Sequence, residues 1–283
     1  MKRQGFQCVI FSVLFICACS NPSVVSAENN PQKTTLSPGW HKNINISGVE
    51  SDIYIPGSYK NKNLILLPGW NFPRMHWVNQ TDLLKFSDLY GYSLILPELK
   101  TTLYESEYFP ETKMKWNPIP GGQYVKNHLI VQLQNQFKIL LPSQKNFLLG
   151  LSTGGRGVAL LALENPDLFT AGASLSGDFS QDTMRKDRLM TLVYGPYEHF
   201  SKRWNGKDNP QKRAAEWKMP LYLSHGKDDR TVPPSQTKMF YEELRKIHNN
   251  QIDVLYRDVP GMGHNLVFWG SELPEVFKFF NNY

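Results

Sequence analysis

The chain has 283 residues, a length that fits one large domain or two small ones. Hydrophobic residues make up 41% and charged residues 20%, close to globular averages, which excludes a wholly disordered chain. The net charge of +6 falls to about +4 without Lys2 and Arg3, an excess too small and too scattered to predict a nucleic-acid partner.

The first 27 residues have the pattern of a secretory signal peptide. A cationic start, Met1–Arg3, precedes an apolar run from Cys8 to Cys19 that is too short to span a bilayer as a helix. Two processing sites remain open: cleavage after Ala27 would release a soluble protein, whereas a bacterial lipobox ending at Cys19 would lipidate that cysteine and tether the protein to a membrane. The sequence therefore predicts an exported protein of the bacterial periplasm or cell envelope, or a secreted one.

All three cysteines, Cys8, Cys17 and Cys19, lie inside this leader. The rest of the chain has no residue for a disulfide, a thiolate nucleophile or a cysteine-based metal site. It also lacks a His-Glu-x-x-His motif and an Asp-rich calcium loop. Neither a metal nor another cofactor is expected.

Short apolar runs, each bounded by turn residues, predict strands that are buried on both faces of a parallel sheet. These runs are 63–67, 93–96, 146–151, 171–175, 221–224 and 252–256. Apolar residues at three-to-four spacing between them predict helices over 80–89, 123–137, 156–164, 236–248 and 274–280.

Residues 44–55 add one or two leading strands, readable as an antiparallel hairpin. The fold class is therefore α/β, a mostly parallel sheet of about eight strands with helices on both faces. We divide the chain into a signal peptide (1–27), a flexible N-terminal segment (28–43) and one α/β domain (44–283). In such sheets the chemistry gathers at the carboxyl ends of the strands.

A Gly-x-Ser-x-Gly motif centred on Ser152 follows one predicted strand and opens the next helix. This context is typical of a nucleophilic serine on a sharp strand-to-helix turn, where Gly150 and Gly154 allow strand and helix to approach closely. The alternatives are a helix N-cap by Ser152 or a phosphate-binding loop, but no lysine stands where such a loop requires one.

A nucleophilic serine needs a base, and the base needs an acid that orients it. Asp228 and Asp229 follow the predicted strand 221–224, and His264 follows the last strand. The chain order Ser, Asp, His is the order of α/β-hydrolases. His225 also sits at a strand end, but it comes too early in this order to be the base.

These residues carry a resemblance to α/β-hydrolases, and more narrowly to the putative-esterase (esterase D-like) branch with its S-formylglutathione hydrolases, feruloyl esterases and mycolyltransferases. The matching stretches are 150–179, 220–233 and 261–264, and with the strand pattern the resemblance covers about 60–281. It implies that Ser152 is the nucleophile, His264 the base and Asp229, rather than Asp228, the acid.

The family also implies an oxyanion hole made of two backbone N–H groups. One is that of Thr153, directly after the nucleophile. The other belongs to the loop after strand 63–67, where Pro68 has no N–H and Trp70 is the expected donor. The chain departs from the family here, since many hydrolases carry His-Gly where it has Pro68-Gly69.

Two insertions, 100–121 and 178–220, are read either as the rim and cap of the pocket or as surface loops fixed by their aromatic residues. The second is charged and lacks the long apolar face of a lipase lid. Aromatic residues of the first, from Tyr104 to Trp116, would narrow the pocket. We therefore expect a small-molecule substrate, a soluble short-acyl or aryl ester.

The primary hypothesis is an exported serine hydrolase that cleaves carboxylic esters through an acyl-enzyme. A peptidase of the prolyl-oligopeptidase type would use the same triad but normally carries a large N-terminal propeller, and only about 35 residues precede the first strand. An acyltransferase would also use these residues. A non-catalytic binding protein is disfavoured because Ser, Asp and His occur in order. The oligomeric state stays open.

Overall fold

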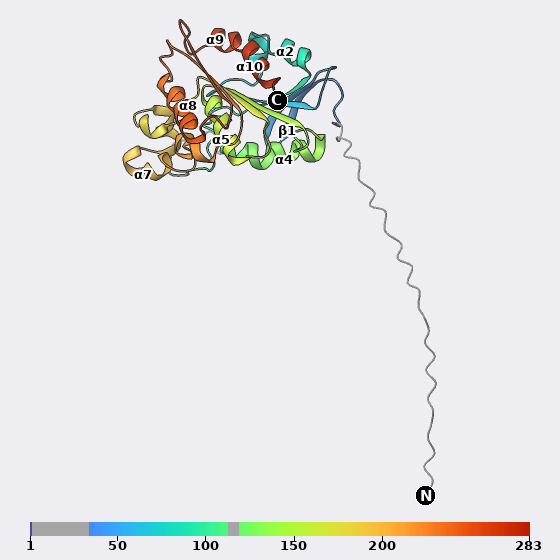
Figure 1. Ribbon diagram of the computed structural model, residues 1–283, viewed down its shortest axis with the longest axis horizontal. Helices are drawn as coiled ribbons and strands as arrows, with labels where there is room; N and C mark the ends of the chain where they lie inside the picture. Colours follow the sequence, from blue (N-terminus) through green and yellow to red (C-terminus); the bar gives the residue numbers. More distant parts are fainter. Residues whose placement is uncertain (2–33, 113–118) are drawn as a thin grey trace. The chain divides into compact units, whose positions relative to one another are not determined.

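One eight-stranded sheet, in the order β1-β2-β4-β3-β5-β6-β7-β8, organises the chain (Figure 1). The computed structural model describes Met1, residues 34–112 and residues 119–283. The strands are β1 Gly39–Ile46, β2 Val49–Ile55, β3 Lys62–Leu67, β4 Tyr92–Pro97, β5 Lys145–Leu151, β6 Ala171–Leu175, β7 Leu221–Gly226 and β8 Val254–Val259. β1 and β2 run antiparallel to their neighbours, and the other pairs are parallel.

Helices cover both faces of the sheet. They are α1 His76–Gln80, α2 Leu83–Tyr90, α3 Gly121–Tyr124, α4 Ile130–Gln132, α5 Thr153–Glu164, α6 Arg188–Tyr194, α7 Tyr197–Trp204, α8 Ser235–His248, α9 Leu266–Ser271 and α10 Leu273–Phe280. The π-helical runs η1 Val125–Leu129 and η2 Leu133–Phe137 flank α4, and the 3-10 helices are η3 Gln181–Thr183 and η4 Pro210–Glu216. The expected α/β-hydrolase fold of about eight strands is confirmed.

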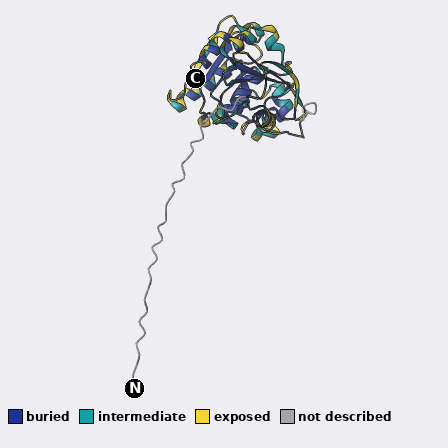
Figure 2. Ribbon diagram, turned by 90° about the vertical axis from the view of Figure 1, so that its right-hand side faces the viewer, coloured by how far each residue is buried: buried dark blue, intermediate teal, exposed yellow. Residues whose placement is uncertain are grey.

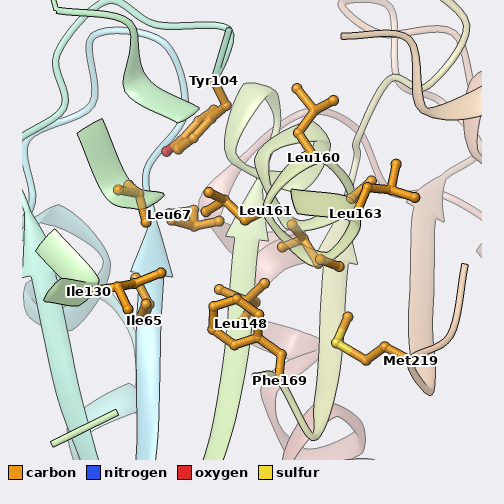
Figure 3. Close-up of a cluster of buried hydrophobic side chains, with 14 of the residues drawn as sticks. Ile65, Leu67, Tyr104, Ile130, Leu148, Leu160, Leu161, Leu163, Phe169 and Met219 are labelled. Carbon is orange, nitrogen blue, oxygen red and sulfur yellow. The ribbon is translucent and has the colours of Figure 1, made fainter. Parts of the chain in front are cut away.

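Alternating side chains of each strand feed two cores, one on each face of the sheet. Ile65 and Leu67 of β3 pack with α5 and α8 in the first core, part of which Figure 3 shows. Leu64 and Leu66 of the same strand pack with α2, α9 and α10 in the second. In Figure 2 the strands are buried, and exposed residues lie on the outer surfaces of the helices.

The N-terminal boundary of the domain is wrong by five residues. β1 begins at Gly39, inside the segment expected to be flexible, and Gly39 pairs with Ile55. The sequence pattern hid this strand because its register shifts between His41 and Ile44, where Asn43 has a positive φ of 55°. Residues 2–33, which hold the predicted signal peptide and both processing sites, lie outside the described residues.

Four short helices in residues 181–216 were not anticipated, because the periodicity of this charged segment is weak. They are η3, α6, α7 and η4. Residues of α6 and α7, among them Trp204, pack with Leu103 in a small third core. No helix in the part of the chain that the structure describes is both long and apolar enough to cross a bilayer.

The parallel register brings the carboxyl ends of six strands, β3 to β8, to one edge of the sheet. Leu67 of β3 pairs with Gly150 of β5, and Leu175 of β6 pairs with both Leu151 of β5 and Ser224 of β7. The segments that follow these strands therefore meet at this edge. They include all the residues expected to carry the chemistry.

Candidate active site

Ser152 occupies the turn between β5 and α5 with φ 55° and ψ −124°, a backbone conformation that is strained for a residue with a side chain. A Cβ on Gly150 would lie 2.1 Å from the carbonyl oxygen of Gly154. A Cβ on Gly154 would lie 1.9 Å from the carbonyl oxygen of Leu67. Only glycine fits at both positions, and the tight turn projects the serine from the edge of the sheet.

The side chain of Ser152 makes no capping hydrogen bond to α5, so the N-cap interpretation is wrong. Its Oγ lies 2.9 Å from Nε2 of His264. Nδ1 of His264 lies 2.7 Å from Oδ2 of Asp229. Because a carboxylate can only accept, Nδ1 carries the proton and Nε2 is left to accept the serine hydroxyl proton.

Asp229, and not Asp228, is the acid that the structure places on His264. The side chain of Asp228 is exposed, whereas that of Asp229 is fully buried. Oδ1 of Asp229 accepts the backbone N–H groups of Thr231 at 2.8 Å and Val232 at 2.9 Å. Although burial opposes ionisation, hydrogen bonds from His225, His264 and Val232 hold the pKa of Asp229 well below its usual range.

His225 is a residue whose place sequence reasoning missed. It is completely buried at the end of β7, and its Nε2 lies 3.1 Å from Oδ2 of Asp229. The sequence analysis set it aside as the base on chain order. The available signal was its position at a strand end, four residues before Asp229.

The two expected oxyanion donors lie on either side of Ser152. Thr153 is the first residue of α5, so its N–H has no partner within the helix. Trp70 lies in the turn that Phe72 closes by donating its N–H to the carbonyl oxygen of Gly69, while the next N–H, that of Asn71, binds the carbonyl of Lys100. Neither Trp70 N–H nor Thr153 N–H has a hydrogen-bond partner among residues 34–112 and 119–283.

The loop that carries Trp70 lies against the nucleophile. A Cβ on Gly69 would lie 3.2 Å from Cβ of Ser152, so this backbone and the serine are in close approach. Trp70 also packs against the small core that α6 and α7 form. Its side chain therefore connects the loop after β3 to α6 and α7.

Aromatic side chains from the opposite face support the base. The ring of Trp269 meets the ring of His264 edge-on at 5.0 Å between centroids, and its Nε1–H donates to Oγ of Ser176 at 3.1 Å. Phe72 meets Trp269 at 5.9 Å. The imidazole is thus packed in place, with 13% of its side chain still exposed beside the serine.

A buried arginine connects α5 to the two insertions, 100–121 and 178–220. Arg156, four residues after the nucleophile, is fully buried and pairs with Asp178 at 3.0 Å. Its guanidinium also donates to the carbonyl oxygen of Leu103, to Gln181 and to the carbonyl oxygen of Asp208. Segments from both insertions are therefore held against the helix that begins at the nucleophile.

Tyr104 does not narrow the pocket as expected. It is 1% exposed, its hydroxyl donates to the carbonyl oxygen of Pro68 at 2.7 Å, and its ring covers Gly157 on α5 (Figure 3). It belongs to the first core, and its hydrogen bond to Pro68 supports the loop that carries Trp70. Phe109 packs against Tyr194, and Trp116 lies outside the described residues.

No group of three or more His, Cys, Asp or Glu side chains within residues 34–112 and 119–283 is arranged to hold a metal ion.

Glu105 lies next to this buried network, and only one of its two carboxyl oxygens has hydrogen-bond partners among the described residues. It is fully buried, and Oε2 accepts the hydroxyl of Thr102 and the N–H of Leu103, both at 2.9 Å. Oε1 has no hydrogen-bond partner among the described residues. Burial, with a smaller contribution from the charge of Asp208, raises the pKa of Glu105 from 4.5 to about 7.

This shift predicts a pH-dependent stability. The folded state binds the Glu105 proton more tightly than the unfolded chain does, so the free energy of unfolding falls as the pH rises from about 4.5 to 7. Glu105→Gln is neutral throughout and escapes this loss. In urea denaturation, the stability of the variant relative to the wild type should increase by about 2–3 kcal/mol between pH 5 and pH 8. A difference that does not change with pH would contradict the assignment.

Comparisons with known proteins find esterases and other serine hydrolases. An acetyl esterase of Caldicellulosiruptor saccharolyticus is 23% identical over 237 residues, which are 77% of this chain and 82% of that protein. Among solved structures, an S-formylglutathione hydrolase of Agrobacterium tumefaciens superposes with a TM-score of 0.68 at 14% identity, over 88% of this chain and 97% of that one. A fluorophosphonate-binding serine hydrolase of Staphylococcus aureus gives 0.66 at 17%, over 86% and 99%.

The sequence profile of the prolyl oligopeptidase family matches residues 130–283. The matched part is more than half of the chain and holds the Ser152 elbow, Asp229 and His264. The structural neighbours independently confirm the α/β-hydrolase fold and include the S-formylglutathione hydrolases that the sequence resembles. The chain belongs to the prolyl oligopeptidase family of α/β-hydrolases.

Proposed function

We propose that the protein hydrolyses small carboxylic esters, with Ser152 as nucleophile, His264 as general base and acid, and Asp229 as the orienting acid. The observation that carries this proposal is the continuous hydrogen-bond chain from Ser152 Oγ through His264 to Asp229, at 2.9 and 2.7 Å. The chain begins at Ser152, whose backbone is strained with φ 55°.

In the acylation step, Ser152 Oγ attacks the ester carbonyl carbon and gives its proton to Nε2 of His264. Asp229 accepts the Nδ1–H bond throughout and stabilises the imidazolium that forms. The tetrahedral intermediate collapses when its C–O bond to the alcohol breaks. His264 then passes the proton to the departing alkoxide, and the acyl group remains on Ser152.

In the deacylation step, water takes the place of the alcohol. His264 removes a proton from the water, the resulting hydroxide attacks the acyl carbon, and the proton returns to Ser152 as the carboxylic acid leaves. An alcohol in place of water would make the same enzyme an acyltransferase. In both steps, the N–H groups of Trp70 and Thr153 would stabilise the oxyanion, a contribution worth about 10²–10³ in kcat for each donor.

Ester specificity is supported by the relatives rather than by the triad, because amide hydrolysis would use the same groups. The acetyl esterase aligns over most of both chains. The short cap helices α6 and α7 carry Arg188, Lys202 and Arg203, so this part of the structure does not offer the wide apolar face of an interfacial lipase lid. A short, soluble acyl group fits these features best.

A peptidase is the second candidate, and membership of the prolyl oligopeptidase family favours it. The substrates that separate the two are matched esters and anilides of one acyl group. Both kinds of enzyme would cleave the ester readily, because an alkoxide leaves more readily than an amine. The observation that separates them is cleavage of the anilide, which needs the better-placed proton donor of a peptidase.

The role of the triad predicts the outcome of four substitutions. Ser152→Ala and His264→Ala should each lower kcat by several orders of magnitude, and Asp229→Asn by about 10³–10⁴-fold, because an amide favours the wrong tautomer of His264. Asp228→Asn is the matched control, since that side chain is exposed, and its kcat should stay within about twofold.

These variants are checked by steady-state kinetics on protein whose fold is verified by circular dichroism, and by labelling with a fluorophosphonate probe. Near-normal turnover in folded Ser152→Ala would refute the nucleophile. Asp228→Asn proving more damaging than Asp229→Asn would move the acid by one residue.

The substrate proposal is tested with p-nitrophenyl esters of increasing acyl length and with a proline-containing p-nitroanilide peptide. We expect kcat/KM to be highest for acetyl to butyryl esters and to fall steeply beyond about eight carbons, as added methylenes stop finding pocket surface. Faster cleavage of the peptide would favour the peptidase. Activation at an emulsion interface would favour a lipase.

We also propose that the chain is exported, on the basis of the pattern in its first 27 residues. Mass spectrometry of protein from its natural host is expected to find an N-terminus at Glu28, or an acylated Cys19 in a detergent-soluble form. An intact Met1 would refute export by either route.

A further inference from the structure

One oxygen of Asp229 is shared by two imidazole rings. Oδ2 accepts from Nδ1 of His264 at 2.7 Å and from Nε2 of His225 at 3.1 Å. The other oxygen is fully occupied by the backbone N–H groups of Thr231 and Val232. Every side-chain hydrogen bond that restrains Oδ2 therefore comes from a histidine.

The surroundings of His225 determine which of its nitrogens carries a proton. Nε2 faces two groups that can only accept, Oδ2 of Asp229 and the carbonyl oxygen of Val232, both at 3.1 Å. Nε2 must therefore be the protonated nitrogen. His225 and His264 consequently bind the same carboxylate through different ring nitrogens.

The opposite side of the His225 ring is held by α8. Nδ1 lies 2.7 Å from Oγ1 of Thr237, and that hydroxyl also lies 3.2 Å from the carbonyl oxygen of Gly177. Both ring nitrogens of His225 therefore have hydrogen-bond partners. The completely buried ring is thereby fixed between β7, α8 and the acid turn.

The charged groups near this arrangement are few. Lys227, Asp228 and Arg230 of the acid turn are exposed, and within the described residues the titratable side chains that bind Asp229 are His225 and His264. Besides the backbone N–H groups, the hydrogen bond from His225 Nε2–H is thus the main local influence on how much negative charge Asp229 presents to His264.

We propose that His225 is a positioning residue that orients Asp229 through its Nε2–H and shares the charge of Oδ2 with His264. This inference rests on the proposed function of the triad. With the bond in place, Oδ2 is aimed at His264, and part of its charge is taken up by a second donor. Without it, Oδ2 is restrained by His264 alone, and His264 faces the undivided charge of Asp229.

Two amide substitutions test the Nδ1 side and the Nε2 side of the His225 ring separately. His225→Asn places an amide where Nδ1 lies, so it keeps contact with Thr237 but cannot reach Asp229. His225→Gln places an amide where Nε2 lies and restores a donor to Asp229. Both are polar and smaller than the ring, so they form a matched pair. His248→Asn, at a histidine that binds the carbonyl oxygen of Ala214 away from the site, is the control for losing an imidazole.

We expect His225→Asn to lower kcat about 10- to 100-fold with KM changed less than about twofold, because a hydrogen bond to a charged group is lost. His225→Gln should recover most of kcat. His248→Asn should match the wild type.

Equal kcat in His225→Asn and His225→Gln would overturn the proposal. Fluorophosphonate labelling of Ser152 in the wild-type protein keeps the two questions apart: no labelling means that the triad proposal fails, whereas normal labelling with indistinguishable variants means that only the His225 proposal fails.

A measurement on the wild-type protein covers the case in which His225→Asn does not fold. Spectra of protein with ¹⁵N-labelled histidine are expected to show His225 protonated at Nε2 and His264 protonated at Nδ1, assigned with the His225→Gln and His264→Ala variants. A neutral His225 that carries its proton on Nδ1 would refute the bond to Asp229 directly.

Discussion

The close approach of α5 to β3 and β5 is the constraint on which the site depends. The backbone of Gly154 lies so near the carbonyl of Leu67 that a single methyl group could not be accommodated. This contact forces the sharp turn at Ser152 and holds that side chain at the edge of the sheet. It also places the first N–H of α5 beside the loop that carries Trp70. The proposed nucleophile and oxyanion donors are thus positioned by the same packing contact.

A second set of contacts, all of them hydrogen bonds, holds Asp229 in place. Asp229 is an ionised group in a buried turn, and such a group is tolerated only when its hydrogen-bonding capacity is met. Two backbone N–H groups and two histidines meet it. Because burial strengthens each of these bonds, the carboxylate is rigid and strongly ionised, which suits a group that must stabilise an imidazolium without taking its proton.

The cap is attached to the catalytic helix by buried charge rather than by a broad apolar interface. Arg156 reaches segments from both insertions and is compensated by Asp178. Breaking such a pair from one side leaves an uncompensated buried charge, which costs about 3–5 kcal/mol. Segments of both insertions are therefore fixed relative to Ser152.

The sequence by itself determined the sheet, the elbow and the order of the triad, because each depends on local patterns: apolar runs that end in turn residues, glycines around Ser152, and Asp229 and His264 directly after strands. It missed β1 before Ile44, where a bulge breaks the alternation, and the cap helices, whose short charged sequences have weak periodicity. It also assigned Tyr104 to the pocket, since aromatic composition does not reveal which way a ring faces.

Only the tertiary structure decided that Tyr104 supports the loop that carries Trp70 and that His225 forms a hydrogen bond with Asp229. Both contacts arise from strands and loops that are brought together by sheet register and packing, and a one-dimensional pattern carries no information about such neighbours.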